Sequence, residues 1–295
     1  QARQLRDDGF VVIPDAQIPS STIEKVASSS KLELSDLLQL VAHAGVDPVE
    51  QLYNFNEVCH RFKYRWDFRV QPESRAWEEL MTQAIDTVSP IIRELHRLSV
   101  HPDEGGHRMT RLITPKSPTA IMSGAILSKP GALSQRFHAD ASPTHLRMAS
   151  LFPSHRLFNI FVPLVDIEAN GDGTQFLPGT HHSRRAKHRF KQAVERAGRL
   201  EDDATTMATA VAPACPAGGV MLFDYRVLHR GLANNSTRDR PIAYSVCSTG
   251  WAWDNCNFPD TKIRNVVEYL PKDQDELKLT RDVISKSCPY WYDIL

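Results

Sequence analysis

Two histidines and one aspartate in the C-terminal half are the residue types of a mononuclear metal site. His138 and Asp140 are two positions apart, and His229 follows 91 residues after His138 (229 − 138). Two imidazoles and one carboxylate can occupy one face of an Fe(II) ion and leave the opposite face open for oxygen chemistry. If the three side chains meet in space, the sequence predicts a non-haem iron oxygenase.

A His-x-Asp pair alone is weak evidence, because His101-Pro102-Asp103 matches the same pattern. That second pair contains proline and lies in a turn-rich stretch, so we interpret it as a solvated loop. His138 and Asp140 instead close a segment with strand character, in which residues i and i+2 point to one face. We therefore prefer them as ligands.

His229 follows Gly218-Gly219-Val220-Met221-Leu222-Phe223-Asp224, an apolar segment that ends in a polar residue. His229 has an alternative interpretation as a core histidine satisfied by a backbone carbonyl. Arg240 opens the apolar run Arg-Pro-Ile-Ala-Tyr-Ser-Val-Cys-Ser. A guanidinium is costly to bury without a partner, and its planar fork suits a carboxylate. The alternative for Arg240 is a surface residue at the start of a strand.

Composition excludes several classes of protein. The 295 residues have a formal net charge of zero, so no global field attracts nucleic acid or an anionic membrane. Five cysteines without a Cys-x-x-Cys pair argue against a disulfide framework or a zinc–thiolate site and favour an intracellular, cytoplasmic location. No apolar run is long enough for a transmembrane span.

The periodicity predicts helices near the N-terminus and strands after it. A short strand ends at Pro14, and helical spacing covers 20–44 and 73–98. From about residue 110, short apolar segments separated by Pro and Gly are typical of a β-sandwich or barrel. We expect strands at 119–128, 133–139, 157–165, 174–177, 207–212, 219–224 and 240–248.

Several segments together resemble the phytanoyl-CoA dioxygenase-like family. They are Phe10-Val11-Val12-Ile13-Pro14 after Asp-Gly, Phe161-Val162-Pro163-Leu164-Val165-Asp166, the stretch from Asn170-Gly171-Asp172-Gly173-Thr174 to Pro178-Gly179-Thr180-His181, and His229-x10-Arg240. The resemblance implies a mainly β fold with flanking helices, a double-stranded β-helix of the jelly-roll, cupin-like kind. It also implies Fe(II) as cofactor, with 2-oxoglutarate and O2 as cosubstrates.

By the same resemblance, His138, Asp140 and His229 bind iron and Arg240 pairs with the distal carboxylate of 2-oxoglutarate. Thr174 would lie beside the cosubstrate, whereas His181 is expected to be structural. Some 2-oxoglutarate enzymes have a hydroxyl two residues after the arginine. Here position 242 is Ile, so a hydroxyl partner must come from Thr174, Tyr244 or Ser245.

Two further polar residues are candidates for the cosubstrate site. Arg136 shares the predicted inward face with His138 and Asp140, and it either contacts 2-oxoglutarate or an anionic substrate or turns to solvent. Asn159 is the one polar residue in Leu157-Phe158-Asn159-Ile160-Phe161. It either faces the pocket or forms a hydrogen bond within the sheet.

Two charged segments have less specific interpretations. The basic insert at 181–203 is expected to be a solvated helix face, with phosphate binding as the alternative. Residues 61–70 alternate charged and apolar side chains, which predicts a half-buried strand or an extended segment. This strand is an amphipathic edge or a wall of the substrate pocket rather than a nucleic-acid platform.

We therefore predict a single oxygenase domain over residues 1–295. Residues 1–109 form its N-terminal strand and helices, 110–255 its jelly-roll core and 256–295 a C-terminal tail. It acts on a small-molecule substrate, by hydroxylation, desaturation or rearrangement, with no nucleic acid or membrane partner, and a homodimer is left open. The alternatives are a cupin-like metal enzyme that does not use 2-oxoglutarate, a non-catalytic jelly-roll binding module, and an oxygenase directed at nucleic acid. The residues do not specify the substrate.

Overall fold

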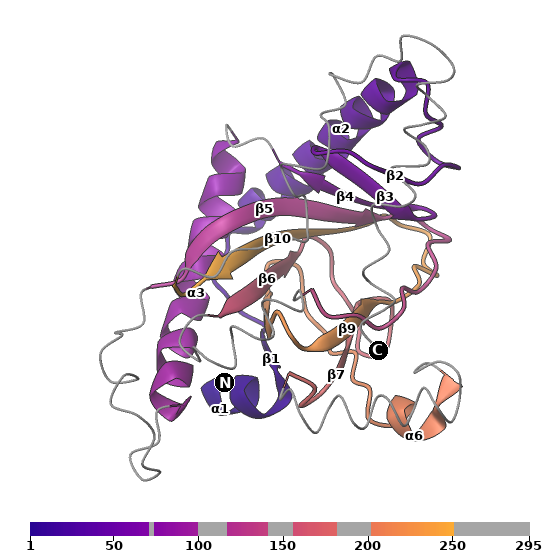
Figure 1. The fold of residues 1–295 in the computed structure, drawn as a ribbon. Helices are drawn as coiled ribbons and strands as arrows, with labels where there is room; N and C mark the ends of the chain where they lie inside the picture. The colour runs from indigo at the N-terminus through magenta and orange to yellow at the C-terminus, as the bar shows by residue number, and fades with distance from the viewer. Residues whose placement is uncertain (71–73, 100–116, 141–155, 182–201, 251–295) are drawn as a thin grey trace.

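The computed structural model describes residues 1–70, 74–99, 117–140, 156–181 and 202–250. Helices from the N-terminal part of the chain lie beside the strands of the large sheet (Figure 1). The helices here are α1 (Ala2–Asp8), α2 (Ser20–His43) and α3 (Arg75–Ser99). The apolar residues Val26, Leu34 and Val41 of α2 recur at helical spacing and are buried. These helices pack on each other and contribute many of the buried apolar residues of the core.

Eight strands form one antiparallel sheet in the order β1-β8-β6-β10-β5-β4-β3-β2. Its central strands β6, β10 and β8 are buried along their whole length. The strands are β1 (Phe10–Ile13), β2 (Tyr53–Asn54), β3 (Val58–Phe62), β4 (Arg65–Arg69), β5 (Thr119–Ser128), β6 (Leu157–Pro163), β8 (Val220–Asp224) and β10 (Arg240–Ser248).

A second, smaller sheet packs against the first. It consists of β7 (Thr174–Leu177) and β9 (Leu228–Gly231). Phe176 of β7 stacks on Phe10 at 4.3 Å between ring centroids and meets Phe223 edge-on at 5.2 Å. Isolated bridges extend this layer on both sides, from His138 to His229 and from Phe176 to Val211. The result is a two-layer sandwich, with its apolar contacts between the layers.

The sequence predicts most of these elements well. Strands 119–128, 174–177 and 240–248 have the predicted bounds, as β5, β7 and β10. Strands 157–165 and 219–224 are close to β6 and β8. Alternation and length suffice here because these strands are regular and buried on at least one face.

The prediction of one strand over 61–70 was wrong. The segment is a hairpin of β3 and β4, with Tyr64 in the left-handed region at φ 60°. Charged and apolar residues alternate without a break from Arg61 through the turn into β4, and the turn at Lys63–Tyr64 contains no Gly, Pro or Asn, so the sequence offers no turn signal. The hairpin does form a wall of the cavity described below, as one interpretation held.

Two other predicted strands are not regular strands. Segment 133–139 is irregular, because within it only His138 exchanges both backbone hydrogen bonds with a residue of β9, His229. Segment 207–212 begins with the end of helix α6 (Ala204–Met207), and only Val211 pairs with the small sheet. Asp203 caps α6 by accepting from the Thr206 backbone N–H, which favours helix over strand there.

Three predictions fall outside the described residues. These are the solvated loop at 101–103, the tail at 256–295 and the basic insert 181–203 apart from His181, Asp202 and Asp203. Among the described helices, none combines the length and the apolar character needed to cross a membrane.

Candidate metal centre and cosubstrate cavity

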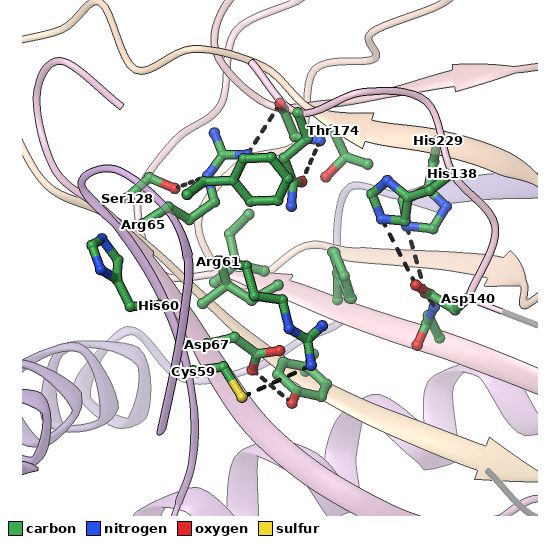
Figure 2. A pocket seen from close by; sticks show the side chains of 18 of the residues that line it. Cys59, His60, Arg61, Arg65, Asp67, Ser128, His138, Asp140, Thr174 and His229 are labelled. Atoms are coloured by element: carbon green, nitrogen blue, oxygen red, sulfur yellow. Dashed lines mark hydrogen bonds and ion pairs between the residues drawn. The ribbon is translucent and has the colours of Figure 1, made fainter. Parts of the chain in front are cut away.

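His138, Asp140 and His229 converge on one point, as the sequence predicted (Figure 2). Asp140 Oδ1 lies 3.8 Å from His138 Nε2, and Asp140 Oδ2 lies 3.5 Å from His229 Nε2. His229 comes from β9, whereas His138 and Asp140 come from the irregular segment that the His138–His229 bridge holds beside it. The side chains of His138 and Asp140 are 17% and 15% exposed, so the point is shielded but reachable.

Backbone carbonyls orient both imidazole rings. His138 Nδ1 donates to the Arg136 carbonyl at 2.9 Å, and His229 Nδ1 donates to the Val227 carbonyl at 3.1 Å. A carbonyl can only accept, so these contacts assign the proton to Nδ1 and leave the Nε2 lone pair facing Asp140. Burial, with a further contribution from His229, lowers the pKa of His138 to about 4. His138 is therefore neutral near pH 7, as a metal ligand must be.

Asn159 holds the carboxylate of this group. It projects from the buried strand β6, and its Nδ2 donates to Asp140 Oδ2 at 2.6 Å. This contact decides between the two interpretations of the sequence, because Asn159 faces the cavity. An amide that fixes the orientation of a ligating carboxylate is a typical outer partner of a metal site.

Arg240 lies at another end of the same cavity, with 3% of its surface exposed. Its Nη2 donates to the Leu232 carbonyl at 2.9 Å, and its Nη1 lies 3.6 Å from Asp172 Oδ2. Its buried Nε–H has no hydrogen-bond partner among the described residues. An unmatched donor at the wall of a cavity is costly unless a ligand accepts from it. Thr174, buried on β7, lines the same cavity.

Arg65 of β4 is a second buried arginine at this end of the cavity. Its sequence context did not predict a residue of the site. Its Nε donates to Ser128 Oγ at 2.9 Å, and its two terminal nitrogens donate to the carbonyls of Gly231 and Leu232. Burial, with a further contribution from Arg240, lowers the pKa of Arg65 to about 9. The only sequence signal was a charged residue inside an alternating strand, and many surface strands share it.

The cavity between these groups has a volume of about 340 Å³. This lies within the usual range for small-molecule sites. Its apolar walls include Met122, Ile126, Phe161, Ile242 and Val246, contributed by β5, β6 and β10. These side chains give the space beside the triad an apolar lining.

A polar patch on the hairpin wall forms the far side of the cavity. Figure 2 shows Arg61 beside Asp67, away from Thr174 and Arg65. The Tyr244 hydroxyl donates to Asp67 Oδ1 at 2.9 Å. Burial raises the pKa of Asp67 to about 6, although Arg61 and the Tyr244 hydrogen bond act against the rise. This patch offers both donors and an acceptor to a substrate.

The remaining predicted residues have the following positions. Arg136 lines the cavity but is exposed, so it lies at the rim. His181 is buried, and its Nε2 donates to the Arg6 carbonyl at 2.9 Å, in agreement with a structural role. Of the hydroxyl candidates, Thr174 and Tyr244 line the cavity, whereas Ser245 donates to the Met122 carbonyl inside the sheet.

The turn before His229 is fixed by an ion pair. Asp224 at the end of β8 accepts from Nε and Nη2 of Arg226 at 2.7 and 2.6 Å. Burial acts to raise the pKa of Asp224, but Arg226 outweighs burial and holds that pKa below its usual value. This bidentate pair sets the path of the chain from β8 into β9 and so the position of His229.

The donor set fits a divalent metal such as iron. Metal–ligand bonds of about 2.1 Å place neighbouring ligand atoms about 3 Å apart, so the observed 3.5 and 3.8 Å separations need only a small contraction. Three protein donors on one side leave the other side for exchangeable ligands. Arg240 can bind a carboxylate, because its guanidinium is buried and positively charged and its Nε–H has no acceptor among the described residues.

Residues 116–242 match the sequence model of the phytanoyl-CoA dioxygenase family. The matched segment contains all four of His138, Asp140, His229 and Arg240. The resemblance stated from the sequence is therefore confirmed over this segment, and so is the prediction of a dioxygenase-type enzyme. The comparison with curated proteins found no match.

Three solved structures share the fold at low sequence identity. The non-haem α-ketoglutarate-dependent epimerase SnoN from nogalamycin biosynthesis is 16% identical, with a TM-score of 0.52 over 84% of this chain and 81% of SnoN. SnoN in complex with Fe3+, α-ketoglutarate and nogalamycin RO gives the same identity and coverage with a TM-score of 0.51. HygX from Streptomyces hygroscopicus, with nickel and 2-oxoglutarate bound, is 13% identical, with a TM-score of 0.52 over 86% of this chain and 88% of HygX. The predicted fold, a mainly β jelly roll with flanking helices, is confirmed.

Proposed function

Starting from the family match of residues 116–242, we propose that the chain is an Fe(II)- and 2-oxoglutarate-dependent oxygenase. Its substrate is a small organic molecule with an unactivated C–H bond. The observation that carries the proposal is the convergence of His138, Asp140 and His229, with Arg240 in the same cavity. SnoN with Fe3+ and α-ketoglutarate and HygX with nickel and 2-oxoglutarate support this choice of metal and cosubstrate.

Each residue of the site has a proposed role. His138, Asp140 and His229 hold Fe(II) through the two Nε2 atoms and the carboxylate. Arg240 binds the distal carboxylate of 2-oxoglutarate, with Thr174 beside it. When bound, the iron with 2-oxoglutarate and O2 supplies the oxidant that removes hydrogen from a substrate carbon, and the cosubstrate becomes succinate and carbon dioxide.

The protein itself contributes orientation and the exclusion of water. Asn159 fixes the Asp140 carboxylate, and the two carbonyls fix the imidazole tautomers. The apolar walls keep water away from the reacting centre. Because Asp140 retains its carboxylate in the triad, no position is vacated for a halide, and halogenation is disfavoured. Hydroxylation is the default outcome, with desaturation or rearrangement as variants of the same hydrogen removal.

Arg240 separates this proposal from the main alternative. A cupin-like metal enzyme that does not use 2-oxoglutarate would need the metal ligands but no buried arginine with an unmatched N–H at the cavity wall. The polar patch of Arg61, Asp67 and Tyr244 lines the same cavity as Arg240 and can hydrogen-bond a substrate, and Arg136 at the rim can contact an anionic group.

The test is succinate formation from 2-oxoglutarate by the Fe(II)-loaded protein in air, with and without a panel of small organic molecules. We expect slow formation with the protein alone, faster formation with an accepted substrate, and loss of both with a chelator. Asp140→Ala should abolish the activity, whereas Asp239→Ala, at an ion pair with Lys31 away from the site, should not. Unconsumed 2-oxoglutarate under every condition would refute the proposal.

A further inference from the structure

Three polar side chains form a row across neighbouring strands at the Arg240 end of the cavity. Arg65 of β4 and Arg240 of β10 are both register partners of Ser128 on β5. Side chains at paired positions of adjacent strands project to the same face. All three line the cavity, so the two guanidinium groups flank one hydroxyl on one wall.

The two guanidinium groups share their acceptors. Ser128 Oγ accepts from Arg65 Nε at 2.9 Å and from Arg240 Nη2 at 3.4 Å. The Leu232 carbonyl accepts from Arg65 Nη2 at 2.6 Å and from Arg240 Nη2 at 2.9 Å. Sharing two acceptors requires the two positive charges to lie close together, which costs free energy unless an anion offsets it.

The charges at this end do not balance. Arg65 and Arg240 are 4% and 3% exposed. Among the described residues, Asp172 is the single carboxylate within ion-pair distance of either, at 3.6 Å from Arg240 Nη1. Two positive charges against one negative charge leave an excess of one. One further carboxylate, supplied by a ligand, would neutralise it.

We propose that Arg65 is a second anion-binding residue of the cosubstrate site, which makes this end of the cavity selective for a keto-diacid over a keto-monoacid. The inference rests on the proposed function, because it takes 2-oxoglutarate as the keto-diacid. Without Arg65, the pair of Arg240 and Asp172 is already neutral, and the distal carboxylate would add an unmatched negative charge. With Arg65, the same carboxylate completes a neutral group of four.

A purely structural role is the competing explanation. Arg65 donates to the carbonyls of Gly231 and Leu232, directly after the strand that carries His229. A Cβ on Gly231 would collide with the Arg65 guanidinium, so this packing is close. The experiment must therefore separate the charge of Arg65 from its contacts with the loop.

The first measurement is calorimetric binding to the Fe(II)-loaded protein without oxygen. The probes are 2-oxoglutarate and 2-oxopentanoate, which has the same keto-acid head but no distal carboxylate. We expect Arg65→Gln to weaken 2-oxoglutarate binding roughly 10- to 100-fold. It should change 2-oxopentanoate binding by less than about twofold. Arg69→Gln, four residues along the same strand and outside the cavity lining, should leave both affinities unchanged.

The second measurement is a charge rescue. Adding Asp172→Asn to Arg65→Gln removes one negative charge and restores the excess of one positive charge. We expect the double variant to regain most of the lost 2-oxoglutarate affinity, and Arg65→Lys to retain it from the start. Thermal unfolding of each unliganded variant shows whether it is folded.

Three outcomes contradict the inference. If Arg65→Gln weakens both keto acids equally and Asp172→Asn restores nothing, Arg65 serves only the loop. If Arg65→Gln binds 2-oxoglutarate as tightly as the unaltered protein, Arg65 contributes nothing to the site. If the unaltered protein itself fails to bind 2-oxoglutarate with Fe(II), the proposed function fails and this inference fails with it.

Discussion

The two ends of the cavity carry unbalanced charges of opposite sign. At the triad, the Asp140 carboxylate supplies a negative charge, and His138 beside it is neutral near pH 7. At the arginine end, Arg65 and Arg240 outnumber Asp172 by one. The first end calls for a cation and the second for an anion. A metal ion together with a cosubstrate that reaches from it to the arginines satisfies both.

The two ends also differ in how the fold supports them. Arg65, Ser128 and Arg240 lie on regular, adjacent strands of the large sheet. Asp140 and His138 lie on an irregular segment, which the His138–His229 bridge and the Asn159 hydrogen bond hold in place. Sheet register therefore fixes the positions of the two arginines, whereas the positions of His138 and Asp140 depend on a few specific contacts.

The largest expected effect is the removal of a metal ligand. His229→Gln should weaken Fe(II) binding by at least roughly 100-fold, since even the loss of an outer partner costs 10- to 100-fold. His43→Gln, at the exposed end of α2, is the matched control and should leave Fe(II) binding unchanged. Metal titration followed by calorimetry measures both. Equal Fe(II) affinity in the two variants would show that His229 does not bind the metal and would contradict a cation site at the triad.

Loss of Arg240 should break the positive end. Arg240→Gln removes the charge with the unmatched Nε–H, and we expect 2-oxoglutarate affinity to fall by roughly 30-fold or more. Fe(II) affinity should stay the same, because Arg240 does not contact the triad. Arg238→Gln, at an exposed position two residues earlier, is the control. A loss of metal binding instead would show that the two ends are not independent.

The Asn159 hydrogen bond should have an intermediate effect. Asn159→Ala removes the donor to Asp140 Oδ2, and we expect Fe(II) affinity or turnover to fall by about 10- to 100-fold. The affinity of the metal-saturated protein for 2-oxoglutarate should change less than in Arg240→Gln. Unchanged iron affinity would mean that the bridge at His138 alone positions Asp140.

The smallest effect concerns Asp67, which belongs to neither end. Burial raises its pKa from 3.8 to about 6, so the folded protein holds the proton more tightly than the unfolded chain. Its stabilising contribution is full below about pH 4 and is lost as the pH rises through 6. Relative to Asp67→Asn, the unaltered protein should lose about 1–3 kcal/mol of stability between pH 4 and pH 8.

Unfolding of the metal-free protein and of Asp67→Asn at these two pH values measures this difference. A difference in stability that does not vary with pH would show that Asp67 titrates normally and that the polar patch is well hydrated.

The sequence predicted the metal end better than the anion end. His138, Asp140, His229 and Arg240 could be found because residue type, spacing and family resemblance agree. Arg65 could not, because its role arises from the register of β4, β5 and β10, which are distant in the chain. The sequence also did not predict the hairpin, because charged and apolar residues alternate from the end of β3 through the turn into β4 and the turn contains no Gly or Pro.

Some segments and residues could not be interpreted from the sequence alone, because only their contacts in the structure decide between the possibilities. Asn159 had two interpretations, and only its contact with Asp140 selects one. The irregular path of 133–139 depends on which of its backbone groups pair with β9, which periodicity cannot show. The single-domain organisation over 1–295 and the role of the basic insert stay predictions.

The most direct test of the whole account is the dependence of 2-oxoglutarate binding on the metal. Calorimetric titration without oxygen would compare the Fe(II)-loaded protein with the same protein after chelation. The account predicts one 2-oxoglutarate per chain with Fe(II) and much weaker binding without it, because the triad and Arg240 must act together. Equal binding with and without Fe(II), or none in either case, would contradict it.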